Sequence, residues 1–239
     1  MIRLDKFVSD AVPCTRKEAT AYIKASRITV DGKIINTADT KIHENKCVIA
    51  FDGKELAYSK HIYIMINKPE GLISATEDVR EKTVMSLLPD SYMTKGLFPA
   101  GRLDKDTTGL LILTNDGNTA HRLLSPKYNK EKVYKVTSAK PFFESDIQKL
   151  KCGVMLDDGK TKPVGLELTD NPNVSYMTLT EGRFHEVKRI CIALDNECTS
   201  LERIKFAGLS LDNSLERGQW RPLTDEEISL LLSVSSEKS

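Results

Sequence analysis

The sequence has few of the features that mark secreted, membrane or metal-binding proteins. Its five cysteines include no C-x-x-C pair, and no histidine lies at the spacing of a zinc finger. Apolar runs such as Leu110–Leu113 are far shorter than the roughly 20 residues that span a bilayer, and the first residues mix charges without an apolar signal core. We therefore expect a cytoplasmic protein with reduced thiols, no metal and no contact with a membrane.

An excess of charge of either sign is also missing. The 35 Lys and Arg residues balance 34 Asp and Glu residues, which leaves a formal net charge of +1. A surface that binds nucleic acid must therefore be local. The motifs G-x-G-x-x-G, H-E-x-x-H and G-x-S-x-G are absent, so the sequence indicates no nucleotide or other cofactor.

The N-terminal quarter of the chain has the pattern of two short helices followed by small hairpins. Apolar residues at helical spacing predict a helix over Leu4–Ala11. Thr15 and Glu18 have the spacing of a capping box, which predicts the start of a second helix. Two Asp-Gly pairs, at Asp31 and at Asp52, are flanked by apolar residues and predict two hairpin turns.

Basic side chains gather on the second helix and at its exit, where Glu18 is the only acid between residues 15 and 28. A basic helix face beside a small sheet suits an RNA phosphate backbone, although an ordinary solvated helix has the same pattern. The residues of this region that we expect to contact RNA are Arg3, Lys6, Arg16, Lys17, Lys24 and Arg27.

The order of these elements, with R-L-D-K-F at the start and I-x-x-x-R-I-T-V-D-G-K after the second helix, resembles the S4 RNA-binding domain. The resemblance covers nearly all of residues 1–56 and implies a small N-terminal S4 (αL-type) domain over 1–58. Residues 59–62 are then a linker, and 63–233 form a second domain. Residues 234–239 are expected to be a frayed tail.

The larger part of the chain mixes strands and helices irregularly, without a repeat. Strands are expected at 62–66, 109–114, 132–137, 174–180 and 203–206, and helices at 118–124, 144–151, 185–194 and 224–233. This order predicts the α+β class, with a mixed, mainly antiparallel central sheet flanked by helices.

Three charged segments interrupt the apolar stretches of this second domain. The first is G-R-L-D-x-x-T-T-G-L-L from Gly101, the second is E-K-x-Y-x-V from Glu131, and the third is E-G-R-x-H-x-V-K-R from Glu181. Taken alone, an Asp before a strand most often caps its own loop, and a Tyr on a strand most often packs in a core. The residues by themselves leave both readings open.

Together the three segments resemble the signature of the RsuA-type pseudouridine synthases over residues 62–232. This resemblance implies the isomerisation of a uridine in RNA to pseudouridine. It makes Asp104 the essential carboxylate, Arg102 its neighbour in the same turn, Tyr134 the ring packed on the target base, and Lys188 the cation paired with Asp104. Glu186 departs from the family, which often has Gln at that position.

The chemistry explains why such residues are needed. Pseudouridine formation breaks the N1–C1′ bond, rotates the freed uracil and rejoins it through C5, without a redox change. A partly buried carboxylate stays ionised when a cation lies within about 4–6 Å of it. Asp104 could attack C1′, attack C6 or remove a ribose proton, and the sequence does not choose among these routes. A Tyr ring suits stacking on a base taken out of an RNA helix.

The segment around Tyr134 should also be locally positive, because its basic residues are accompanied by a single acid, Glu131. His185 could act as a base, or it could hold a phosphate or order its loop. The residues of the second domain that we expect to contact RNA are Arg122, Lys127, Lys130, Lys132, Arg183, His185 and Arg189. With the N-terminal helix they would hold a folded RNA on two surfaces.

The run Ala120–Tyr128, with T-K-P at Thr161, is similar to the small-subunit branch of the family. We therefore expect a monomeric enzyme that modifies one uridine of 16S rRNA, the family's site at uridine 516, in free rRNA or in a small-subunit assembly intermediate. The alternatives are a 23S rRNA pseudouridine synthase and a non-catalytic S4-containing protein that binds rRNA or assists ribosome assembly.

Overall fold

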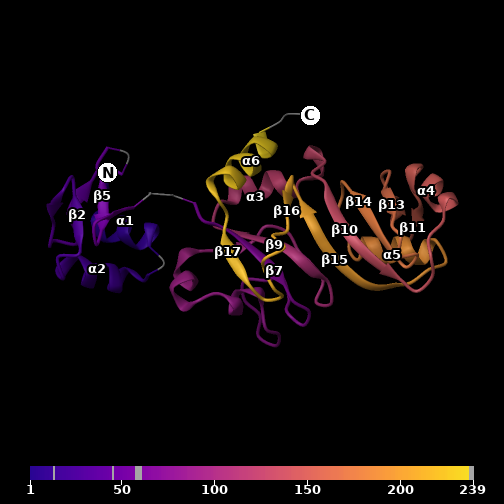
Figure 1. Ribbon diagram of the computed structural model, residues 1–239, viewed down its shortest axis with the longest axis horizontal. Coiled ribbons are helices and arrows are strands. Elements are labelled where there is room, and N and C mark those ends of the chain that lie inside the picture. The colour runs from indigo at the N-terminus through magenta and orange to yellow at the C-terminus, as the bar shows by residue number, and fades with distance from the viewer. Residues whose placement is uncertain (13, 45, 57–60, 237–239) are drawn as a thin grey trace. The chain divides into compact units, whose positions relative to one another are not determined.

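A computed structural model of the chain describes residues 1–12, 14–44, 46–56 and 61–236 (Figure 1). The chain divides into two compact units, Met1–Ile62 with Leu88–Leu97, and Tyr63–Leu87 with Phe98–Ser239. Most of the predicted linker and the end of the predicted tail, residues 237–239, lie outside the described residues.

The first unit contains the predicted pair of helices and two hairpins. Thr15 Oγ1 accepts the Glu18 N–H at 3.2 Å, and Glu18 accepts the Thr15 N–H at 2.7 Å, which confirms the capping box. The strands β1 and β4 were not predicted, because two residues are too few to show a periodicity. The elements are β1 (Ile2–Arg3), α1 (Leu4–Ala11), α2 (Arg16–Lys24), β2 (Ile28–Val30), β3 (Lys33–Ile34), β4 (Lys41–Ile42), β5 (Ile49–Phe51) and β6 (Lys54–Glu55).

A segment from much later in the sequence belongs to the same unit. It contains the 3-10 helix η2 (Asp90–Lys95), and Gly96, at φ 66°, ends this helix in the left-handed region. The ammonium group of Lys95 donates to the main-chain carbonyl oxygen of Cys14 at 3.0 Å and to that of Ser9. The sequence did not predict that this segment joins the first unit. Its contacts are made to main-chain carbonyl oxygens, which every residue has, so no side-chain pattern marks them.

The second unit is built on a mixed sheet with the strand order β13-β14-β10-β15-β9-β7-β17. The β15–β9 pair is parallel and the other pairs of this path are antiparallel, which confirms the predicted sheet type. The strands are β7 (Tyr63–Lys68), β8 (Phe98–Pro99), β9 (Thr108–Thr114), β10 (Lys132–Ser138), β13 (Gly165–Leu168), β14 (Val174–Leu179), β15 (Cys198–Phe206), β16 (Leu209–Ser210) and β17 (Trp220–Pro222), and a separate hairpin joins β11 (Met155–Leu156) to β12 (Gly159–Lys160).

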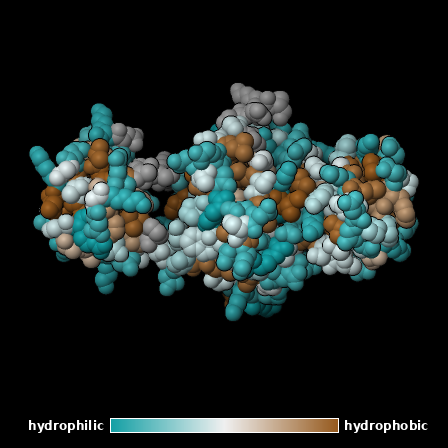
Figure 2. Space-filling model, viewed as in Figure 1, coloured by the Kyte–Doolittle hydropathy of each residue, from teal (hydrophilic) through white to brown (hydrophobic). Residues whose placement is uncertain are grey.

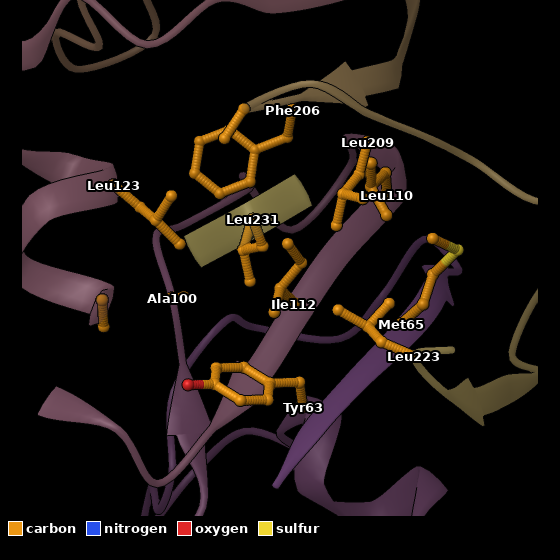
Figure 3. Close-up of a cluster of buried hydrophobic side chains, with 12 residues drawn as sticks. Tyr63, Met65, Ala100, Leu110, Ile112, Leu123, Phe206, Leu209, Leu223 and Leu231 are labelled. Carbon is orange, nitrogen blue, oxygen red and sulfur yellow. The ribbon is translucent and has the colours of Figure 1, made fainter. Parts of the chain in front are cut away.

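Two helices cover one face of this sheet, α3 (Gly117–Leu124) and α6 (Asp225–Ser236). Figure 3 shows Leu123 of α3 and Leu231 of α6 with Ile112 of β9 in one buried cluster. The helix α6 continues to Ser236, three residues into the predicted tail. No Pro or Gly interrupts the sequence there to end the helix earlier.

A second core lies under the other half of the sheet, where α4 (Glu144–Lys151) and α5 (Glu186–Ala193) pack. Val187, Ile190 and Cys191 of α5 are buried against residues such as Val136 of β10 and Met177 of β14. This packing fixes the N-terminal end of α5 beside the sheet. Short 3-10 helices, η1 (Val84–Leu87) and η3 (Pro126–Tyr128), complete the unit.

On the face shown in Figure 2, hydrophobic side chains appear as small separate groups among hydrophilic ones. In the part of the chain that the structure describes, no helix combines the length and the apolar character needed to cross a bilayer.

Candidate active site

A pocket of about 570 Å³ in the second unit brings the three charged segments together. One wall is the loop before β9, the second is β10, and the third is the loop that leads into α5. Of the predicted catalytic residues, Arg102, Asp104 and Tyr134 line it. A cavity of this size is within the ordinary range for a small-molecule ligand and accommodates a nucleotide base.

The carboxylate of Asp104 lies between two basic side chains of the third segment. Lys188 Nζ is 3.3 Å from Asp104 Oδ2, and His185 Nε2 is 3.5 Å from Asp104 Oδ1. The Asp104 side chain is 27% exposed, so it remains open to the pocket. The structure thus places a reachable carboxylate beside a lysine and an imidazole.

Lys188 has a second and closer carboxylate partner that the sequence analysis missed. Its Nζ lies 2.6 Å from Asp106 Oδ1, and the Asp106 side chain is 70% exposed. Burial acts to lower the pKa of Lys188, but Asp106 and Asp104 outweigh burial and raise that pKa above its ordinary value. Lys188 is therefore an ammonium ion shared by two aspartates.

A buried lysine supports the loop of Asp104 from below. Lys68, at the end of β7, is fully buried, and its Nζ donates to the main-chain carbonyls of Pro69, Asp104, Lys105 and Thr107 at 2.9–3.3 Å. Burial lowers the pKa of Lys68 to about 8. Lys68 lies in the segment N-K-P-x-G from Asn67 to Gly71, where nothing local marks the lysine as buried.

Tyr134 is half-buried on β10, where it packs against the second core and also lines the pocket. The pairing of β10 with β15 has a register shift between Val133 and Tyr134. Such irregularities redirect a side chain relative to the regular alternation of a strand. The ring is thus available to both the core and the pocket.

Two buried cations form part of the pocket wall. Arg203 of β15 is 1% exposed, and its Nε donates to the Leu110 carbonyl oxygen at 2.9 Å. Its Nη2 has no hydrogen-bond partner among the described residues. Lys132 donates to the Glu181 carbonyl oxygen at 3.1 Å, and burial lowers the pKa of Lys132 to about 8. Arg203 was missed because a charged residue on a strand resembles an ordinary solvent-facing position.

Glu186, which departs from the family pattern, is 5% exposed at the first turn of α5. Its Oε2 accepts the main-chain N–H of Arg183 at 3.0 Å. Burial, and then a hydrogen bond with the side chain of Glu181, raise the pKa of Glu186 to about 7. A protonated Glu has the neutral charge of the Gln that the family often carries there.

Arg183 and Arg189, both expected to contact RNA, are engaged within the protein. Arg183 Nη1 lies 3.2 Å from Asp158 Oδ1, and Arg189 Nη1 lies 3.1 Å from Asp158 Oδ2. Asp158 is in the turn between β11 and β12. These contacts hold the loop that presents His185, so they fix the pocket wall.

The other predicted RNA contacts of this unit differ in exposure. Arg122 and Lys127 are exposed, whereas Lys130 and Lys132 are only 8% and 9% exposed. Lys132 is drawn inward because its amino group reaches backbone carbonyls and lies 5.9 Å from the Phe206 ring. Arg102 is exposed, and the structure shows no hydrogen bond from it to Asp104 among the residues it describes.

In the first unit, four of the six predicted RNA contacts carry carboxylate partners. Arg3 and Arg16 lie 2.9 and 3.1 Å from Asp5, and Lys6 lies 3.2 Å from Asp10. Arg27 pairs with Asp52.

Lys17 and Lys24 are exposed on α2 and form no ion pair among the described residues. In this they differ from Arg16 of the same helix, which is paired with Asp5.

Within residues 1–12, 14–44, 46–56 and 61–236, no group of three His, Cys, Asp or Glu side chains is arranged to hold a metal ion.

Comparison with known proteins places this geometry in context. Residues 62–193 match the family model described as RNA pseudouridylate synthase, and residues 2–46 match that of the S4 domain, which confirms both resemblances. The chain is 42% identical to the uncharacterized RNA pseudouridine synthase YtzG of Bacillus subtilis (strain 168), over 96% of this chain and 98% of that protein.

It is 40% identical to ribosomal small subunit pseudouridine synthase A of Escherichia coli (strain K12), over 95% of this chain and 98% of that protein. A solved structure titled as that of a pseudouridylate synthase is similar at a TM-score of 0.68 and 38% identity, covering 97% of this chain and all of that one.

Proposed function

The chain belongs to the RNA pseudouridylate synthase family, and we propose that it converts one uridine of small-subunit ribosomal RNA to pseudouridine, with Asp104 as the essential carboxylate. The observation that carries the proposal is the position of this carboxylate, open to the pocket and 3.3 Å from the Lys188 ammonium. The relatives named for the ribosomal small subunit support the choice of RNA. Uridine 516 of 16S rRNA is the specific target we propose.

The pocket residues divide the work of the isomerisation. The target uridine leaves the RNA helix and packs on Tyr134. Asp104 acts on the nucleotide as nucleophile or base while the N1–C1′ bond breaks, and the Lys188 ammonium lies 3.3 Å from its carboxylate as a counter-ion. The uracil then turns, C5 bonds to C1′, and the proton leaves C5 while N1 gains one. Atoms and charge balance without a redox partner or a cofactor.

RNA is held outside the pocket as well. The exposed Lys17 and Lys24 of α2 and the exposed Arg122 and Lys127 near the pocket supply charge for phosphates. The substrate is free 16S rRNA or a small-subunit assembly intermediate in the cytoplasm, and the protein acts as a monomer.

Carbodiimide primer extension tests the reaction and the target together. Purified wild-type protein and Asp104→Asn are incubated with 16S and 23S rRNA, as free RNA and as subunits. The proposal expects one stop in 16S rRNA that requires Asp104. A stop in 23S rRNA would keep the reaction and replace the target, and no stop on any substrate would favour an RNA-binding protein without activity.

Tyr134→Phe separates the two uses of the tyrosine. Stacking needs only the ring, whereas removal of the C5 proton would use the hydroxyl group. Full activity of the Phe variant would leave the ring as the working part, and a large loss of kcat with unchanged RNA affinity would assign the hydroxyl to the chemistry.

A further inference from the structure

An aromatic side chain that the proposed mechanism does not use lies at the mouth of the pocket. Phe184 is 74% exposed and lines the pocket. Its ring stacks on that of His185, with the centroids 3.8 Å apart and the planes 18° apart. Single exposed apolar side chains are common on protein surfaces, but this ring lines the same pocket as Asp104.

The backbone around this ring is built to hold it outward. His185 has φ 49°, a left-handed conformation that costs free energy for any residue with a Cβ atom and that recurs at functional sites. The conformation is retained by contacts on either side. The Arg189 side chain donates to the Phe184 carbonyl oxygen at 3.1 Å, and the Arg189 N–H donates to the His185 carbonyl oxygen at 3.0 Å.

One face of the Phe184 ring is covered by His185, and the exposure of the side chain leaves room for a planar group on the other. His185 in turn lies 3.5 Å from the Asp104 carboxylate. A base stacked on Phe184 would therefore extend a continuous stack that ends at the reactive group. The nucleotide beside the target uridine supplies such a base, because the strand must pass the mouth of the pocket when the uridine enters it.

We propose that Phe184 is a stacking site for the base of the nucleotide next to the target uridine. The inference rests on the proposed function. Every base has a π-face, so the site binds the neighbouring nucleotide without selecting its identity. The stacking site positions the RNA strand at the mouth of the pocket, in addition to the contacts made with the uridine.

The first experiment observes the stack directly. Hairpin RNAs carrying the region of uridine 516 receive 2-aminopurine in place of the nucleotide on the 5′ or the 3′ side of the target, and fluorescence is read at saturating protein. Wild-type protein should quench one of the two reporters. Phe184→Ala should abolish this quenching, while Phe184→Tyr should retain it.

The second experiment measures turnover with an abasic residue at the quenched position. Phe184→Ala should lower kcat/KM about tenfold on intact RNA, since stacking on an aromatic residue is worth roughly 1–3 kcal/mol per base. On abasic RNA the same substitution should have no further effect, because the two changes remove one contact. Phe184→Leu, which keeps an apolar side chain without a planar ring, should behave as Phe184→Ala.

Phe143→Ala is the matched control. Phe143 is also an exposed phenylalanine, at 63%, but it precedes α4 and does not line the pocket. The Phe143→Ala substitution should leave both the fluorescence quenching and the turnover unchanged.

The outcomes separate the two proposals. Conversion of the hairpin without quenching of either reporter would overturn the stacking site alone. So would losses of kcat/KM from Phe184→Ala and from the abasic residue that add when the two changes are combined. A hairpin that neither binds nor reacts would overturn both proposals for this RNA. Equal losses of quenching and turnover in the Phe143 and Phe184 variants would overturn the stacking site, because the loss would then follow from removing any exposed ring.

Discussion

The ammonium nitrogen of Lys68 lies 3.0 Å from the main-chain carbonyl oxygen of Asp104. Lys68 ends β7, and Asp104 lies in the loop that precedes β9, its partner in the sheet. The lysine thus ties the backbone of the reactive residue, while the side chain of Asp104 is left for Lys188 and the substrate. Main-chain support of this kind holds a carboxylate in place without neutralising it.

Lys68→Met tests this support. The substitution leaves four main-chain carbonyl oxygens without the buried ammonium that they share, so the free energy of unfolding should fall by about 3 kcal/mol. kcat should fall as the loop loosens. Urea denaturation and turnover measure the two effects. Lys105→Met is the control, since it removes an exposed ion pair with Glu81 and should cost less than about 1 kcal/mol. Equal effects of the two variants would contradict the assigned role.

Glu186 should make stability depend on pH. Its pKa is raised from 4.5 to about 7 in the folded protein, so the folded state binds more protons than the unfolded state between these values. The free energy of unfolding should therefore fall as pH rises from about 4.5 to 7.

Glu186→Gln cannot ionise, and it should be more stable than the wild type by about 3 kcal/mol at pH 8 and similar to it near pH 5. Denaturation at the two pH values measures this difference. Glu167→Gln, an exposed position of β13, controls for the loss of a carboxylate. Identical pH profiles of the wild type and Glu186→Gln would rule out the role of Glu186.

Gly109→Ala should disrupt the parallel pair at the centre of the sheet. Gly109 has φ 100°, and a Cβ atom there would lie 2.3 Å from the Arg203 main-chain oxygen. We expect a loss of about 3 kcal/mol or more in the free energy of unfolding, measured by denaturation. Gly117→Ala, at the start of α3 with no atom within 4 Å of the added Cβ, should be neutral or slightly stabilising. A tolerated Gly109→Ala would show that the two strands can separate at little cost.

Lys17→Gln combined with Lys24→Gln should weaken RNA binding without changing catalysis at saturating RNA. Two fewer phosphate contacts should reduce the slope of log K against log salt by about 1.4–1.8. The control removes two lysines from a helix of the other unit, Lys149→Gln with Lys151→Gln, and should leave the slope unchanged. An unchanged slope of log K against log salt in the α2 variant would show that Lys17 and Lys24 do not contact RNA phosphates.

The sequence predicted the elements that local patterns encode. The capping box at Thr15 and the strand Thr108–Thr114 follow from spacing and apolar runs over a few residues. The S4 and pseudouridine synthase resemblances predicted the domain types for the same reason, since their motifs are contiguous in the chain.

The residues that were missed depend on long-range contacts. Lys68 acts through carbonyl groups some 36 residues away, and Arg203 is buried only because β15 lies beside β9. Asp106 gained its partner from α5, 82 residues later. Conversely, Lys130 and Lys132 were expected to contact RNA, because local charge does not reveal which lysines the fold turns inward.

The place of β15 in the sheet has a consequence for synthesis of the chain. β15 lies between β9 and β10, although both of these strands end 60 or more positions before it begins. The strand that follows the Asp104 loop, β9, and the strand that carries Tyr134, β10, are therefore joined into one sheet only when Cys198–Phe206 has left the ribosome. Because non-local strands pair late, a nascent chain cannot carry an assembled active site until β15 has been translated.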